Sequence, residues 1–147
     1  MNKPIIILLP LLFLFFSCTQ NQTDSLIYEP AGSADYYINN QSSTDLKVIF
    51  ITTSVLGSKT DSSVVGANST SKIMDDGIIG VNPRPEDSIS ILTFYNSEKS
   101  AEPVFTVDPV TNEEWEIIGT DFDDTGYGLT EYEFTITNGL LEKLFLN

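Results

Sequence analysis

The fold of this chain is decided by a stretch near its C-terminus, residues 130–137, which reads TEYEFTIT. Apolar Tyr132, Phe134 and Ile136 alternate here with Thr and Glu. A period of two residues is that of a β-strand, in which successive side chains point to opposite faces of a sheet. The stretch therefore predicts a strand that packs one face on a core and turns the other face to solvent.

The residues that follow predict how the chain leaves this strand. Asn138 and Gly139 are the pair preferred in two-residue hairpin turns. Such a turn would fold residues 140–146 back as a last strand, which is the structure we expect. The leucines and the phenylalanine of this segment also have the spacing of one apolar helix face, so one or two turns of helix are the alternative.

Short β-prone runs separated by turn residues extend upstream as far as residue 35. They lie at residues 36–38, 46–53, 62–65, 71–74, 88–95, 104–107 and 115–118. The Gly-containing segments 77–87 and 119–128 are expected to be loops. Seven to eight strands without a long helix predict an all-β fold, namely a single small immunoglobulin-like β-sandwich over residues 35–147. Its expected core is Tyr36, Ile38, Val48, Phe50, Ile89, Ile91, Trp115, Ile117, Tyr132, Phe134 and Ile136.

The N-terminus has the pattern of an export signal. Lys3 precedes an apolar run at residues 5–16, which is shorter than the roughly 20 residues that a membrane-spanning helix needs. Ser17 and Cys18 follow directly. This end resembles a bacterial lipoprotein signal, of the looser form with Phe before Ser-Cys found in Bacteroidota. The alternative is an ordinary secretory signal in which the Cys falls by chance.

The resemblance implies how the chain is processed and where it goes. Residues 1–17 would be removed as a signal peptide, and Cys18 would be diacylated on sulfur and acylated on its new amine. Thr19 in place of Asp favours the outer membrane, and the single acid among residues 19–24 favours a periplasm-facing orientation over surface exposure. Residues 18–34 would then form the acylated Cys and a flexible tether to the β-sandwich.

A second resemblance covers residues 36–140. The chain has a Tyr36-Tyr37-Ile38-Asn39-Asn40 opening, a long second strand, a Trp in the last third, and a closing strand with alternating aromatic residues. In this order of features it is similar to small Bacteroidota lipoproteins of unknown function. The likeness implies a fold and a location in the cell envelope, and it brings no catalytic residue with it.

Composition excludes several classes of function. The chain has 147 residues, with 7 basic and 21 acidic residues, no His and one Cys, and its net charge is −14. Without His there is no Ser-His-Asp triad and no imidazole metal ligand, and one Cys forms no internal disulfide. The negative charge excludes nucleic acid as an expected partner, because phosphates must be neutralised by Lys and Arg. We therefore expect no enzyme.

One acidic segment partly matches a calcium-binding loop. Asp121, Asp123 and Asp124 precede Thr125 and Gly126, so oxygen ligands come before a glycine bend. The fifth position holds Thr, and the twelfth holds a Tyr of the predicted closing strand instead of Glu. The three aspartates are the expected ligands if calcium binds, which is the one cofactor the sequence suggests. A solvated acidic loop is the alternative.

Exposed aromatic side chains are the other candidate binding groups. Tyr37 lies on the face opposite Tyr36, and Tyr127 lies between two glycines, so both could contact a glycan, whereas Trp115 is expected to fill the core. The sequence thus predicts a non-enzymatic lipoprotein of the cell envelope, held at the membrane by its lipid. It would act as an interaction or accessory module for another envelope protein. The alternative is a glycan-binding or calcium-binding β-sandwich module.

Overall fold

The computed structural model describes residues 29–53, 57–98 and 101–144 of the chain. Within these residues the chain is built almost entirely of β-strands, joined by two short α-helices and one turn of 3-10 helix. The strands are β1 (Ala31–Asn40), β2 (Leu46–Thr52), β3 (Lys59–Val65), β4 (Ser69–Ile79), β5 (Ile89–Asn96), β6 (Pro103–Val107), β7 (Trp115–Phe122) and β8 (Gly128–Ile136). The helices are α1 (Pro85–Ser88), the 3-10 turn η1 (Asn112–Glu114) and α2 (Asn138–Leu144).

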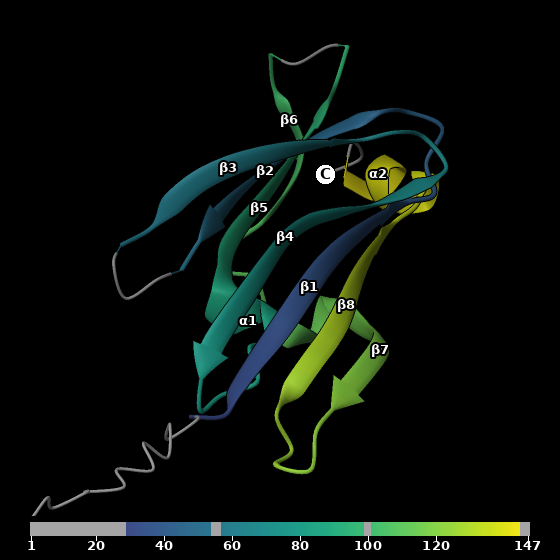
Figure 1. Cartoon of the computed structure of the whole chain (residues 1–147). Coiled ribbons are helices and arrows are strands. Elements are labelled where there is room, and N and C mark those ends of the chain that lie inside the picture. Colours follow the sequence, from purple (N-terminus) through teal and green to yellow (C-terminus); the bar gives the residue numbers. More distant parts are fainter. Residues whose placement is uncertain (1–28, 54–56, 99–100, 145–147) are drawn as a thin grey trace, which may run out of the picture.

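The strands form two four-stranded sheets packed face to face, as Figure 1 shows, with the orders β4-β1-β8-β7 and β3-β2-β5-β6. Strand β1 runs parallel to β8, and the other paired strands are antiparallel. The predicted small all-β sandwich is therefore confirmed. The strand order is not that of an immunoglobulin domain, in which the first two strands share a sheet, because β1 and β2 here lie in opposite sheets.

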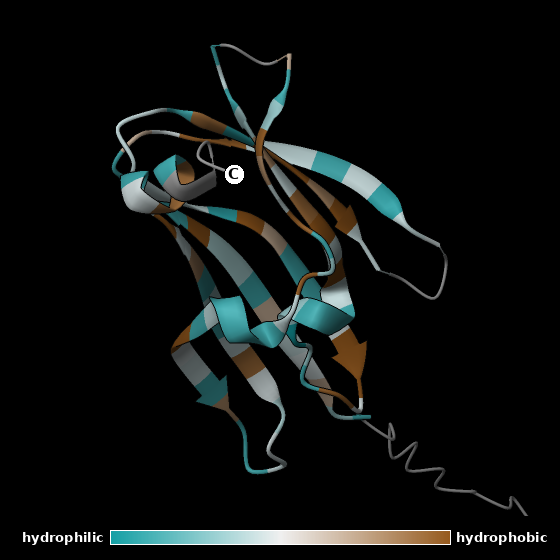
Figure 2. Ribbon diagram, turned by 180° about the vertical axis from the view of Figure 1, so that it is seen from behind, coloured by the Kyte–Doolittle hydropathy of each residue, from teal (hydrophilic) through white to brown (hydrophobic). Residues whose placement is uncertain are grey.

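The core forms where the inward residues of the two sheets meet. Along β1 and β8 buried residues alternate with half-buried ones, as the period of two predicts. Figure 2 shows the same alternation of hydrophobic and hydrophilic residues along the strands. Trp115 is buried, and its ring packs edge-on against Tyr36 and Phe134, with ring centroids 5.7 Å and 5.5 Å away. Its predicted place in the core is confirmed.

Two residues of the expected core, Ile91 and Ile117, are not buried. Ile91 is half-buried because the pairing of β2 with β5 shifts between Ile51 and Thr52, so that Leu92 and not Ile91 shares the inward face with Ile89. Ile117 is exposed, since the opposite sheet does not cover this part of β7. A shift of register is set by neighbouring strands, so the local sequence of β5 does not reveal it.

Strands β1, β4 and β7 extend into segments that were predicted to be tether or loop. β1 begins at Ala31, so residues 31–34 are strand and not tether, and residues 18–28 lie outside the described part of the chain. β4 continues to Ile79 and β7 to Phe122, which shortens the two predicted loops. Pairing between strands supplies hydrogen bonds here that override the weak β-propensity of Gly, Ser and Asp.

The predicted last strand at residues 140–146 is wrong, because helix α2 occupies Asn138–Leu144. Thr137 follows β8 and caps this helix: its Oγ1 accepts a hydrogen bond from the Leu140 N–H at 3.1 Å, and its carbonyl accepts from Leu140 and Leu141. Leu141 is buried, which anchors the helix to the sandwich. Among the described residues, neither helix has the length and apolarity needed to cross a membrane.

Candidate functional site

A cleft lies at the end of the sandwich near the start of β1 and the tip of the β7–β8 hairpin. Figure 1 shows these two parts of the chain at the same end of the molecule. The volume of the cleft is about 500 Å³. The walls come from the segment between β4 and α1, from α1 itself, from β7, and from β8. The lining residues are Val81, Asn82, Arg84, Asp87, Ile117, Thr120, Phe122, Thr130 and Tyr132.

Asn82 holds two walls of this cleft together. Its Nδ2 donates a hydrogen bond to the Gly126 carbonyl at 3.0 Å, and its Oδ1 accepts one from the Gly128 N–H at 3.4 Å. The neighbouring Val81 carbonyl accepts from the Gly32 N–H at 3.1 Å. A Cβ on Gly32 would collide with both Val81 and Asn82, so a glycine is required at this close approach. These contacts therefore fix the walls of the cleft relative to each other.

Strand β7 forms one rim of the cleft and is an edge strand, since it pairs with β8 on one side only. Ile117 is 57% exposed, and Ile118 and Phe122 are each 47% exposed. Across the cleft Val81 is 45% exposed. Scattered apolar residues on a surface are ordinary, whereas a contiguous group beside an unpaired edge marks an interaction site. We refer to Ile117, Ile118 and Phe122 with the unpaired backbone of β7 as the β7 edge.

The floor of the cleft is rigid. Tyr132 is buried and stacks on Tyr36 with ring centroids 5.7 Å apart. The Tyr36 hydroxyl donates to Ser88 Oγ at 2.8 Å, which donates in turn to Asp76 Oδ2 at 2.7 Å. Burial raises the pKa of Tyr36 and that of Tyr132, while the charge of Arg84 acts in the opposite direction on Tyr132. Both phenols therefore stay neutral at ordinary pH and serve as fixed packing groups.

The outer face of the same sheet carries carboxylates. Glu116 of β7 lies directly opposite Glu133 of β8. Glu133 accepts a hydrogen bond from Asn39 Nδ2 at 2.8 Å, and Glu131 accepts one from the Tyr37 hydroxyl at 3.2 Å. These donors are neutral, so they orient the carboxylates without cancelling their charge.

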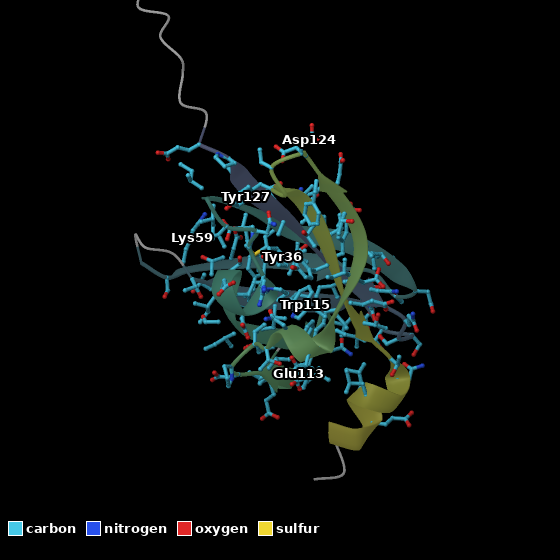
Figure 3. The ribbon with its side chains drawn as sticks, turned by 90° about the horizontal axis from the view of Figure 1, so that it is seen from below. Tyr36, Lys59, Glu113, Trp115, Asp124 and Tyr127 are labelled. Carbon is cyan, nitrogen blue, oxygen red and sulfur yellow. The ribbon has the colours of Figure 1, made fainter. Side chains whose placement is uncertain are left out.

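Tyr37 and Tyr127, the two predicted aromatic ligand groups, do not form a common platform. Tyr37 is half-buried in the middle of β1, and burial, together with its hydrogen bond to Glu131, raises its pKa. Tyr127 is half-buried in the β7–β8 hairpin, where its carbonyl accepts from the Asp123 N–H at 2.9 Å. Figure 3 labels Tyr127 between Asp124, near the hairpin tip, and the buried Tyr36 and Trp115. Among the described residues, no ring contact joins the two tyrosines.

The three predicted calcium ligands are exposed, and one of them, Asp123, supports the turn of the hairpin. Asp123 Oδ1 accepts hydrogen bonds from the N–H of Thr125 at 2.8 Å and from its hydroxyl, which holds the pKa of Asp123 below its ordinary value. Asp121 lies within β7 opposite Leu129. Within the described parts of the chain, no three carboxylates are grouped so that they could hold a metal ion. The geometry therefore does not assemble Asp121, Asp123 and Asp124 as a ligand set.

Cys18, the predicted lipidation residue, lies outside the described residues. The cleft itself was not predicted from the sequence. Ile117, which lines it, and its neighbour Ile118 are adjacent apolar residues, so they lack the alternation that would separate an exposed strand face from a buried one. One feature of the sequence does point to exposure of this strand. Residues 113–124 contain six carboxylates around Ile117 and Ile118, and so dense a group of charges is unusual in a buried strand.

No family model matches this chain, and no curated protein matches it in sequence. The cleft and the β7 edge are therefore the features from which its function is inferred.

Proposed function

We propose that this protein is a non-enzymatic lipoprotein of the cell envelope, anchored through Cys18 in the outer membrane and facing the periplasm, which docks another envelope protein at the β7 edge. One observation carries the docking role: an edge strand with one unpaired side presents Ile117, Ile118 and Phe122 beside a cleft of about 500 Å³. Such an edge offers free backbone hydrogen-bonding groups and apolar contacts together. Strand addition uses this combination for recognition of extended segments.

The position of the cleft relative to the anchor supports the same role. The Pro30 carbonyl accepts a hydrogen bond from the Gly80 N–H at 2.8 Å, beside the cleft wall at Val81. Residues 19–29, which would connect Pro30 to the acylated Cys18, span at most about 40 Å when extended. A partner at the β7 edge would thus lie close to the membrane surface, where other envelope proteins are available.

Photo-crosslinking in living cells tests the docking role. A photo-reactive phenylalanine analogue replaces Ile118 in the full chain, and a matched variant carries it at Val64, which is 61% exposed on β3 of the other sheet. We expect position 118, and not position 64, to form a covalent adduct with one envelope protein. Equal adducts from both positions, or none from 118, would refute the proposal.

The anchor needs a separate measurement. Growth with an alkyne fatty acid should label the wild-type chain, and Cys18→Ser should lose the label and leave the membrane fraction. Label that persists in the Cys18→Ser chain would refute the anchoring part of the proposal and leave the docking part standing.

A further inference from the structure

We infer that the β7 edge takes an extended basic segment of another protein, in which apolar residues that enter the cleft alternate with Lys or Arg residues that lie over the outer face of the sheet. This inference rests on the docking function proposed above and specifies the chemistry of the partner. The two faces of β7 carry the argument, because a strand added at the edge would present its side chains alternately to each.

The inner face of β7 is open and carries two exposed apolar residues, with Thr120 between them. Ile117 and Phe122 line the cleft from β7, with Val81 and Tyr132 on the other walls. A strand hydrogen-bonded to the free edge lies about 4.8 Å from β7, so every second side chain of it would project into this space. Apolar side chains at these positions would cover the exposed part of Ile117, which the other sheet leaves open to solvent.

The outer face of the same edge is acidic. Glu116 of β7 lies opposite Glu133 of β8, so two like charges face each other directly across the strand pair. Glu131 of β8 lies opposite Gly119 and adds a third carboxylate to this face. Asp121 adds a further exposed carboxylate, because it alternates with the cleft-lining residues of β7. Among the described residues, the ion pairs involve Lys59 and Lys72, and none includes these carboxylates. Lys or Arg residues of an added strand would supply the missing counter-charge.

Charge also excludes a second copy of this chain as the preferred occupant. Antiparallel pairing of two β7 edges would bring together two copies of the segment 113–124, each with six carboxylates. Both chains carry a net charge of −14, so their approach is repulsive. Arg84 and Asp87, the charged groups that line the cleft, have opposite signs and leave this balance unchanged. The carboxylates that repel a copy attract a basic strand.

Binding of synthetic peptides to the purified full chain in detergent tests the inference. The peptide Lys-Val-Lys-Val-Lys-Val-Lys should bind, whereas its Glu-Val counterpart and an isomer with its valines contiguous should not. Raising the salt concentration from about 0.01 M to about 1 M should weaken binding strongly, because the Debye length falls from about 30 Å to about 3 Å. Fluorescence anisotropy of labelled peptide measures each affinity.

Matched variants locate the binding. Glu116→Lys should weaken binding of the lysine peptide roughly tenfold, and Ile117→Lys should abolish it. Asp61→Lys and Val64→Lys, at exposed positions on β3, should leave it unchanged.

Three results would overturn the inference: equal binding of the acidic peptide, an equal loss of binding in the β3 variants, or self-association of the chain that Ile117→Lys abolishes. If position 118 crosslinks an envelope protein while the lysine peptide fails to bind, the partner chemistry is wrong and the docking function stands. If the peptide binds but no crosslink forms, the docking function is wrong.

Discussion

Asn40 has no exposed surface, yet both polar atoms of its side chain are used. Its Oδ1 accepts from the N–H and hydroxyl of Ser42, and three carbonyls, of Thr44, Val65 and Gly66, lie 2.8 to 3.1 Å from its Nδ2. A buried amide with all its partners holds the turn after β1 against the end of β3. The sequence shows a polar residue at the end of β1, but only the contacts between distant segments show that it is buried.

Asn40→Asp should therefore lower the free energy of unfolding by about 3 kcal/mol, because a carboxylate would face three buried carbonyl oxygens. Urea unfolding followed by circular dichroism measures the loss. Asn112→Asp is the matched control: Asn112 uses only Oδ1, which accepts from the Glu86 N–H at 3.2 Å, and Asp retains that acceptor. A loss of similar size in both variants would contradict this account of Asn40.

The chain of hydroxyls under the cleft makes a second residue-scale prediction. Ser88→Ala leaves the buried Tyr36 hydroxyl without its acceptor and should cost about 1 to 3 kcal/mol. Tyr36→Phe removes the hydroxyl itself, so the double variant should be more stable than the sum of the single losses implies. Urea unfolding of the four proteins gives the coupling energy. Strictly additive losses would show that Tyr36 and Ser88 do not act as a unit.

At the scale of elements, period-two patterns predicted the central strands well. β8 and β1 alternate as expected, because each has one face on the core and one on the solvent. The sequence did not reveal which strand would be an edge, since the order β4-β1-β8-β7 depends on long-range pairing. For the same reason the exposed Ile117 was assigned to the core and the cleft was missed. The hydrophobic pattern of a strand indicates which of its faces is buried, but it does not indicate which strands lie beside it.

The end of β8 shows how a local signal can mislead. Asn138-Gly139 suits a hairpin turn, but Thr137 before it is an N-cap that starts α2. Thr137→Ala should lower the free energy of unfolding by about 1 kcal/mol, whereas Thr137→Ser keeps the hydroxyl and should cost less. Thermal unfolding of both variants measures the difference. Equal losses would mean that the cap hydroxyl does not stabilise the helix.

The close contact of Gly32 in β1 with Val81 and Asn82, between β4 and α1, gives a prediction that links an element to the cleft. Gly32→Ala should displace Val81 and Asn82, because the new methyl group would occupy their positions. We expect a loss of stability together with weaker binding of the lysine peptide. Gly77→Ala, on the paired strand β4, meets only the Gly32 carbonyl at 3.8 Å and should change binding little. Unchanged peptide binding in a folded Gly32→Ala chain would separate the cleft from the binding surface.

At the scale of the whole molecule, charge works against folding. The chain has 21 acidic and 7 basic residues, and among the described residues only Lys59 and Lys72 form ion pairs. Salt weakens those few exposed pairs, and it also screens the repulsion among the many unpaired carboxylates. Repulsion involves far more groups, so its screening should dominate.

The melting temperature of the full chain should therefore rise as the salt concentration increases from about 0.01 M to about 0.5 M, over which the Debye length shortens severalfold. Glu116→Gln, which removes one member of the opposed Glu116–Glu133 pair, should raise the melting temperature most at low salt and much less at high salt. Calorimetry at both salt concentrations measures the two effects. A gain for Glu116→Gln that is the same at both salt concentrations would show that packing, and not repulsion, changes at this position. A melting temperature that falls with salt would mean that the few ion pairs outweigh the repulsion among the carboxylates, and it would contradict this account.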